Sequence, residues 1–434
     1  MGENGNNDRG GEDKMGVDFD KVRKLILSEG FWKEKVRKEM EYAVLGEKWR
    51  ERYRDSERIF VRVRNDVEGG DRCKGCSMER ECLKRGRVFS EYVSGLVEEY
   101  RGEGIPLIGG RVFFVGEALG FEEREKKRVF CGKAGYLLRG TICAVRFASE
   151  EYSFLRRVFW SAKKKGIFLH EEEDLFWWGI GIGNVLKGCP TSLKKGREAI
   201  RQPNQAEIER CSAYLAEEIL DFCPENIVLL GKTALLGFWQ VVRNWQKKEV
   251  ISSESISAVK EVFFSGDSSF EKRVGKSVKI RVGFGKTDKG FKGNGENKGD
   301  IIWREVNVYL INHPSRIVRM YGFTEDEGFT NGGRNAVESG KDRRIETFIS
   351  ILGKTVGRWC EVMEERIRDA LWFDSREEEL EEVLKDVWKR RALSKGSKDR
   401  MGSKGKEKET GGNMARVEVV KRRREILKKL IKRR

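Results

Sequence analysis

The 434-residue sequence contains only two histidines and no apolar run long enough to cross a membrane. Its first sixteen residues, MGENGNNDRGGEDKMG, are polar and lack the apolar stretch of a signal peptide. Hydrophobic residues make up 38% of the chain, below the roughly 45–50% usual for globular proteins. We therefore expect a soluble, cytoplasmic protein, not a membrane protein, with only part of the chain in one large core.

Charged residues are abundant, at 37% of the chain, and their balance is strongly basic. The formal net charge is +17 and the isoelectric point is about 9.4. A basic excess of this size favours a polyanionic partner, most simply nucleic acid. A well-solvated basic surface without any ligand is the alternative interpretation.

Composition divides the chain into segments. Residues 1–70 combine a polar tail with an accessory helical segment, because apolar residues recur there at helical spacing. Residues 71–352 form the main domain, interrupted at about 247–300 by a stretch rich in glycine, lysine and asparagine that predicts a flexible insertion. Residues 353–394 predict a helical extension, and 395–434 a polar linker with a basic helical tail suited to binding DNA phosphates.

The main domain contains four short apolar runs separated by stretches with helical spacing. The runs are residues 112–115, 176–182, 227–230 and 306–311. This alternation predicts an α/β fold, a three-layer αβα sandwich around a central four-stranded parallel sheet, flanked by helical basic extensions. Ligands of such folds bind at the carboxyl ends of the strands. Gly116, Asn184 and His313 follow three of these runs.

Nine cysteines in a reducing compartment indicate free thiols or metal ligands, not a disulfide scaffold. Cys73 and Cys76 form a C-x-x-C pair, a spacing that suits two thiolates on one metal or cluster. A second pair is needed to close such a site, and Cys189 and Cys211 are candidates. The other five are expected to be buried apolar residues: Cys82, Cys131, Cys143, Cys223 and Cys360.

Six short motifs follow one another in the main domain: GEALG at 116–120, FCGKAGYLL at 130–138, NVLKGCP at 184–190, the run from Arg201 to Cys211, IVLLG at 227–231 and HPS at 313–315. In this order they resemble the motifs of family 4, the iron–sulfur uracil-DNA glycosylases, and the resemblance covers residues 71–352 apart from the insertion. GEALG is similar to the family's GEAPG, and FCGKAGYLL to PFVGxAGxLL. NVLKGCP resembles NVVKCRP, and the run from Arg201 to Cys211 resembles RxPxxxEIxxC.

The resemblance implies a 4Fe–4S cluster held by Cys73, Cys76, Cys189 and Cys211. It implies a DNA-repair enzyme that removes uracil from single- or double-stranded DNA and leaves an abasic site. We accordingly expect a monomer that associates with the nucleoid.

A pocket for the flipped uracil is also implied by the resemblance. Phe130 would stack on the base, Asn184 would pair with its Watson–Crick edge, and His313 would donate to O2 as the glycosidic bond breaks. The backbone around Glu117 and Ala118 would contact the same oxygen. Because position 118 holds no carboxylate, stabilisation of the departing uracil anion is expected to carry most of the catalysis.

Several positions depart from the family motifs. Leu119 and Val129 each replace a proline of the motifs, Cys131 replaces a valine, and Gly188 is inserted before Cys189. The matching carboxylate Glu123 is retained and is expected to activate or orient water. Three alternatives stay open: a non-catalytic nucleic-acid-binding relative, a glycosylase for another deaminated base such as hypoxanthine, and a zinc protein without iron.

Overall fold

The computed structural model describes residues 17–38, 73–91, 111–164, 179–266, 269–285, 301–371 and a few positions between 382 and 389. The chain divides into two compact units, residues 1–383 and 384–434, and the features below belong to the first. The predicted basic tail at 413–434 lies outside the described residues.

A five-stranded sheet forms the centre of this unit, in the order β2-β1-β5-β7-β6. The strands β1 (Val112–Gly116), β2 (Ile180–Asn184), β5 (Asn226–Leu230) and β7 (Ile301–Ile311) run parallel to one another. They correspond to the four predicted apolar runs, so the α/β class with a parallel sheet is confirmed. The sheet also has a fifth strand, because β6 (Ser277–Gly285) adds an antiparallel edge strand.

The structure describes residues 247–266 and 269–285 of the predicted insertion at 247–300. Its described part contains α12 (Ser253–Phe264), α13 (Phe270–Arg273) and β6. Val278, Ile280 and Val282 are buried in β6 and alternate with exposed Lys279 and Arg281. The period of two that marks a half-buried edge strand was present in the sequence, and the high local charge obscured it. The glycine-rich residues 286–300 lie outside the described part.

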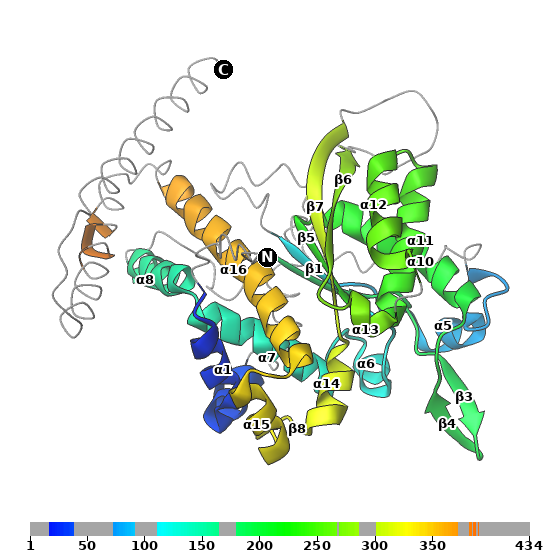
Figure 1. The fold of residues 1–434 in the computed structure, drawn as a ribbon, viewed down its shortest axis with the longest axis horizontal. Helices are drawn as coiled ribbons and strands as arrows, with labels where there is room; N and C mark the ends of the chain where they lie inside the picture. The colour runs from blue at the N-terminus through cyan, green and yellow to red at the C-terminus, as the bar shows by residue number, and fades with distance from the viewer. Residues whose placement is uncertain are drawn as a thin grey trace, which may run out of the picture. The chain divides into compact units, whose positions relative to one another are not determined.

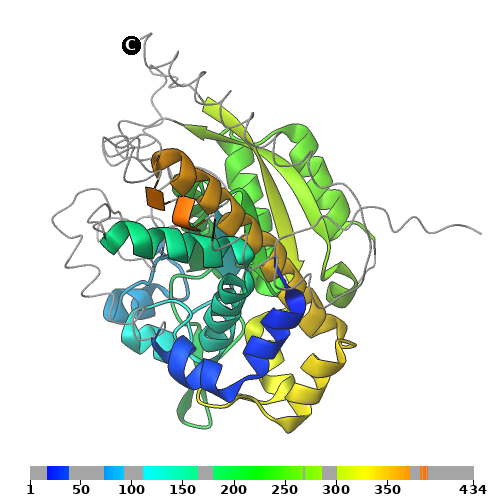
Figure 2. The same cartoon turned by 90° about the vertical axis from the view of Figure 1, so that its left-hand side faces the viewer.

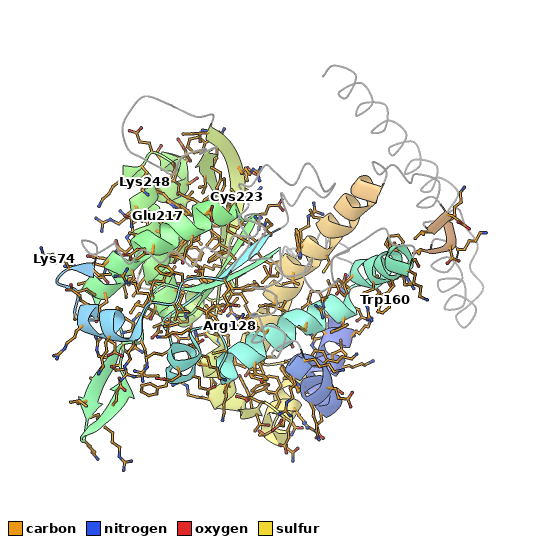
Figure 3. The ribbon with its side chains drawn as sticks, turned by 180° about the vertical axis from the view of Figure 1, so that it is seen from behind. Lys74, Arg128, Trp160, Glu217, Cys223 and Lys248 are labelled. Carbon is orange, nitrogen blue, oxygen red and sulfur yellow. The ribbon has the colours of Figure 1, made fainter. Side chains whose placement is uncertain are left out.

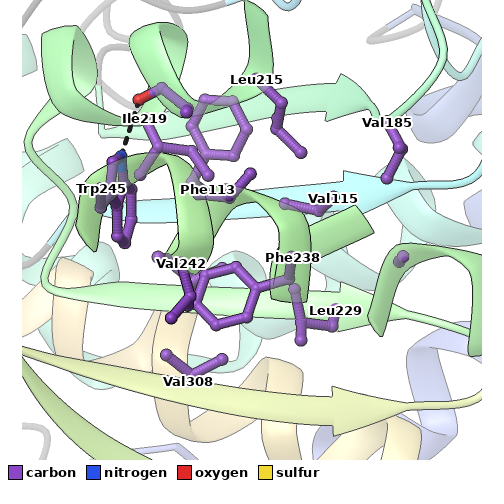
Figure 4. Close-up of a cluster of buried hydrophobic side chains, with 14 of the residues drawn as sticks. Phe113, Val115, Val185, Leu215, Ile219, Leu229, Phe238, Val242, Trp245 and Val308 are labelled. Carbon is purple, nitrogen blue, oxygen red and sulfur yellow. Dashed lines mark hydrogen bonds between the residues drawn. The ribbon is translucent and has the colours of Figure 1, made fainter. Parts of the chain in front are cut away.

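Helices cover both faces of the sheet, which gives the predicted three layers (Figures 1 and 2). On one face lie α10 (Gln205–Phe222), α11 (Lys232–Lys247) and α12, and on the other α7 (Lys133–Ala148) and α16 (Arg343–Leu371). Glu217 of α10 pairs with Lys248 after α11 at 3.4 Å, and Figure 3 shows the two on the rear of the molecule. Figure 4 shows the main core, where β1, β5 and β7 meet α10 and α11. Trp245 lies there fully buried and donates its Nε1–H to the Ala216 carbonyl at 3.2 Å.

The N-terminal helices belong to the same unit as the sheet. The helix α1 (Phe19–Leu27) and the π-helical turn η1 (Phe31–Val36) pack on α7, close to α15 (Asn331–Ser339). Trp32 is fully buried, and its ring lies 4.8 Å from that of Phe323. The helix α16 crosses the predicted domain boundary at 352 without interruption and also packs on α8 (Glu150–Lys164). Among the described helices, none is long and apolar enough to span a membrane.

Candidate active site

The carboxyl ends of three parallel strands bring together residues that are far apart in the sequence. Gly116 ends β1 and Asn184 ends β2, and the two are opposite each other in the strand register. His313 follows β7 and caps α14 (Pro314–Tyr321). Because parallel strands end at the same edge of a sheet, the three positions share one rim.

Phe130 and Asn184 meet over Gly116. A β-carbon on Gly116 would lie 2.2 Å from Asn184 Oδ1 and 2.4 Å from Cζ of Phe130. No side chain therefore fits at position 116 unless Asn184 and Phe130 move. The rings of Phe130 and His313 are 6.1 Å apart between centroids, with 30° between their planes. The structure thus gathers Phe130, Asn184 and His313, as the sequence predicted.

Asn184 carries an unused hydrogen-bond donor. Its side chain is only 1% exposed, and Nδ2 has no partner among the described residues. An unsatisfied buried polar group costs about 1–3 kcal/mol of stability. Most buried polar groups in folded proteins are paired, and an exception requires an explanation. A side-chain donor that binds a ligand would explain this exception.

The proton of the His313 ring can be assigned from its neighbours. The backbone amide of Ser315 donates to Nδ1 of His313 at 3.2 Å, and the Ser315 hydroxyl lies 2.7 Å from the same nitrogen. Since an amide can only donate, Nδ1 is an acceptor and the neutral ring carries its proton on Nε2. Burial, with a smaller contribution from Arg319, lowers the pKa of His313 to about 4. The imidazole is therefore neutral at pH 7.

Phe130 is held in a left-handed backbone conformation, with φ at +52°. Such a conformation costs of order 1–3 kcal/mol for a residue with a side chain, so its surroundings must stabilise it. The amide of Phe130 donates to Glu123 Oε1 at 2.5 Å, and its carbonyl accepts from Arg139 Nε at 3.2 Å. A β-carbon on Gly135 would come within 1.9 Å of the same carbonyl. The glycine in the motif therefore permits the turn that presents Phe130.

An ion-pair network behind Phe130 was not predicted from the sequence. Glu91 accepts from Arg128 at 2.8 Å and from Arg139 at 3.2 Å. Burial lowers the pKa of Arg139, while the nearby Glu91 carboxylate raises it. Glu91 lies outside every motif, so no local pattern identifies it. The one sequence feature that points to this network is the position of Arg139, which lies on α7 four residues after the motif glycine Gly135.

Glu123, the predicted water-activating residue, has both carboxylate oxygens in use. Oε2 accepts from the Gly120 amide at 2.6 Å, and Oε1 accepts from the Phe130 amide. Burial raises the pKa of Glu123, and these two amides oppose the shift. The contacts make Glu123 a positioning residue for Phe130, and its role in activating water stays a prediction.

The segment Glu117–Ala118 is tied to the loop that follows Asn184. The Glu117 carbonyl accepts from the Leu186 amide at 3.0 Å, and its carboxylate accepts from the Thr233 hydroxyl at 2.8 Å. Ala118 packs at the border of the main core. The predicted backbone contact for the base therefore lies at the same rim as Asn184.

Three of the four predicted cluster ligands lie in neighbouring elements. Cys73 and Cys76 form a turn before α5 (Glu79–Arg85), and Cys211 lies on α10. The Ser77 hydroxyl donates to Glu207 at 2.5 Å, and Cys73 Sγ lies 3.7 Å from the Tyr214 hydroxyl, so the turn is docked on α10. Lys74, in the middle of the turn, lies at the outer edge of the molecule (Figure 3).

Cys189, the fourth predicted ligand, has different neighbours. It lies beside the ion pair that Arg124 makes with Glu198 at 2.7 Å, and burial raises its pKa to about 11. Cys82, which was predicted to be a buried apolar residue, is buried and lies in the same core cluster as Cys211. In the described part of the chain, no three His, Cys, Asp or Glu side chains are grouped so as to hold a single metal ion.

Comparison with known families matches residues 105–330 to the uracil DNA glycosylase superfamily. The match includes Phe130, Asn184 and His313 and covers more than half of the chain. Among curated proteins no match was found. The strand order, the gathered rim residues and this match agree, and the chain belongs to the uracil DNA glycosylase superfamily.

Proposed function

We propose that this protein hydrolyses the N-glycosidic bond of deoxyuridine in DNA and leaves an abasic site. Membership of the superfamily points to a glycosylase that acts on DNA. The observation that supports uracil is the unpartnered Nδ2 of buried Asn184 beside Phe130. A carboxamide offers one acceptor and one donor side by side, which complement the N3–H and O4 of uracil.

Phe130 supplies the stacking surface for a base that has left the duplex. Extruding a nucleotide costs a few kcal/mol, and stacking on an aromatic ring recovers about 1–3 kcal/mol. The backbone contacts of Phe130 with Glu123 and Arg139 fix the ring before the base arrives. Less freedom is then lost on binding.

Bond cleavage places negative charge on the departing uracil. The bond between C1′ and N1 breaks, its electron pair stays on the base, and part of the charge reaches O2. Neutral His313 donates from Nε2 to this oxygen, and the backbone near Glu117 and Ala118 lies at the same rim. Water then adds to C1′ and releases its proton to solvent.

Hypoxanthine is the main alternative base, because its N1–H and O6 present the same donor and acceptor to Asn184. The two bases differ in size, so the shape of the site must separate them. A relative that binds DNA without cleaving it is the second alternative. Oligonucleotides containing one uracil, hypoxanthine or cytosine, incubated with the protein and then with alkali, test all three. We expect strand breaks at uracil, whereas breaks at hypoxanthine alone or at no base would reject the proposal.

Asn184→Asp provides the sharper test of base recognition. A carboxylate accepts from the amino group of cytosine, so the variant should gain activity on cytosine relative to uracil. Asn226→Asp is the matched control, because Asn226 lies at the opposite end of the parallel strands and accepts from Asn307 at 3.3 Å. The control should keep the preference for uracil.

We also propose that the protein holds a 4Fe–4S cluster, with Cys73, Cys76 and Cys211 among its ligands. Thiolates are the usual ligands of such clusters. The family match begins at residue 105 and so does not include Cys73 and Cys76; the support is the docking of their turn on α10. A single zinc ion needs sulfurs about 3.8 Å apart, as follows from Zn–S bonds of about 2.3 Å. A cluster places iron and sulfide between the thiolates and accepts a wider spacing.

A further inference from the structure

Position 188 has a thiol beside it that comes from another part of the chain. A β-carbon on Gly188 would lie 2.7 Å from Sγ of Cys82 and 3.7 Å from the methyl group of Met78. The space for a side chain at position 188 is therefore filled by Cys82. Counted from Asn184, Gly188 is the fifth residue of the run, the place that a cysteine holds in the resembled motif NVVKCRP.

The insertion of Gly188 also moves the next cysteine along the chain. Cys189 lies one residue further on, among Arg124, Glu198 and Glu81. Arg124 is buried and is already paired with both carboxylates. A thiolate at Cys189 would compete with these carboxylates for Arg124, on the side of the loop where the ion pairs lie.

Cys82 shares a buried cluster with two of the predicted ligands. It lies on α5, six residues after Cys76, and packs in one cluster with Cys211, against which Cys76 also packs. Burial raises the pKa of the Cys82 thiol, and Cys211, Cys73 and Cys76 raise it further. Cys73, Cys82 and Cys211 are each exposed by only 6–8%, so the group is shielded from solvent without being sealed from it.

We propose that Cys82, with Cys73, Cys76 and Cys211, forms the four-thiolate site, and that Cys189 lies outside it. The inference rests on the cluster in the proposed function. Three ligands then come from residues 73–82, and α10 supplies the fourth. Each thiol loses its proton to solvent as it binds iron. The Lys187 amide lowers the pKa of Cys211 and Arg87 lowers that of Cys82, which offsets part of the negative charge.

The test measures iron and sulfide per chain after anaerobic purification and reconstitution. Cys82→Ala should lose nearly all iron, although Cys189 is still present. Cys189→Ala and the control Cys360→Ala should keep the wild-type content. The reverse pattern, with iron retained by Cys82→Ala or lost by Cys189→Ala, would overturn the proposal.

A rescue variant guards against a simple folding defect. In Cys82→Ala/Gly188→Cys, the new side chain enters the space that the Cys82 thiol leaves, so iron content and visible absorption should return. If this double variant melts like the wild type but still lacks iron, a thiol at position 188 does not take the place of the Cys82 thiol, and the proposal loses this support. Wild-type protein alkylated before and after iron chelation gives a second readout. Cys82 should become reactive only after chelation, whereas unchanged reactivity of Cys82 would contradict ligation.

The identity of the bound metal and the release of uracil are measured separately. Zinc without iron in the wild type, lost in Cys82→Ala, would support the thiolate set and reject the cluster. Wild type that binds neither metal would overturn both. Iron in the expected pattern without uracil release would reject the proposed substrate and leave the ligand assignment intact.

Discussion

The backbone amide of Phe130 donates to Glu123 Oε1 at 2.5 Å, so a carboxylate seven residues earlier holds the aromatic residue of the site. Hydrogen bonds to charged groups contribute about 1.5–3 kcal/mol. Glu123→Ala should therefore weaken substrate binding by roughly tenfold or more, because the left-handed turn at Phe130 loses its main support. Binding of a uracil-containing oligonucleotide, measured by fluorescence anisotropy, checks this.

The same variant separates positioning from water activation. If Glu123 activated water, its removal would abolish one limb of the pH–rate profile of single-turnover cleavage. A positioning role predicts a profile of unchanged shape and a higher half-saturating enzyme concentration. Glu122→Ala is the matched control, since Glu122 is exposed and lies next to Glu123. If Glu123→Ala loses a limb of the pH–rate profile and Glu122→Ala does not, Glu123 is a catalytic residue.

Asn184→Leu should abolish uracil excision without lowering the free energy of unfolding. Leucine has nearly the shape of asparagine, and it removes the buried Nδ2 that has no described partner. Removing an unsatisfied buried donor is expected to be neutral or stabilising, by up to about 1–3 kcal/mol. Thermal melting and single-turnover cleavage on the same preparation measure both effects. A large loss of stability would show that the Asn184 amide serves the fold.

His313→Ala should lower the single-turnover rate by about 10²–10³-fold, as loss of a donor to a developing anion does elsewhere. Because burial lowers the pKa of His313 to about 4, the wild-type ring stays neutral throughout the neutral range. The wild-type rate should therefore show no inflection near pH 6.5. An inflection there that His313→Ala removes would mean that the ring titrates with an ordinary pKa.

The lowered pKa of His313 also predicts how stability depends on pH. The unfolded chain takes up a proton near pH 6.5, but the folded ring does so only near pH 4. Stability is thus fully present above pH 6.5 and is lost as pH falls to about 4, by on the order of 3 kcal/mol. His313→Gln should lose less stability than the wild type between pH 7 and 4.5 in denaturant titrations. Equal losses would contradict the assignment.

The hairpin of β3 (Thr191–Lys194) and β4 (Arg197–Ile200) carries Lys194, Lys195 and Arg197 at its exposed tip. Each phosphate contact adds about 0.9 to the slope of log affinity against log salt on duplex DNA. Replacing the three cations by alanine should flatten this slope by up to about 2.7, equally for uracil-containing and normal DNA. Deletion of residues 413–434, the predicted basic tail, belongs in the same assay. An unchanged slope for the triple variant would show that the hairpin does not contact DNA phosphates.

The fold was predictable where its strands are buried on both faces. All residues of β1 and β5 are buried, and apart from Gly116 and Asn226 they are large apolar residues; such runs between helices indicate a parallel sheet. The edge strand β6 was missed because it alternates lysine and arginine with valine and isoleucine in a glycine-rich, charged region. The role of the N-terminal helices was also missed, since their partners on α7, α15 and α16 are distant in the sequence.

The candidate site was predictable to the extent that its residues belong to ordered motifs. Phe130, Asn184 and His313 meet because each follows or faces the end of a parallel strand. Glu91 and Cys82 could not be found in this way. Their roles depend on which side chains the fold brings beside them, and the spacing of residues within a motif carries no such information.

The ion pair between Arg23 and Glu346 joins residues that are 323 positions apart. Together with the contact of Trp32 and Phe323, it closes a loop that contains nearly every strand and helix of the sheet domain. Contacts of such long range slow folding, because the entropy of closing the loop is lost before the contact forms. On the ribosome, α1 can meet α7 first, but its ion pair with α16 must wait until residue 346 has been synthesised. Full hydrogen-exchange protection of α1 is therefore expected to come late in folding.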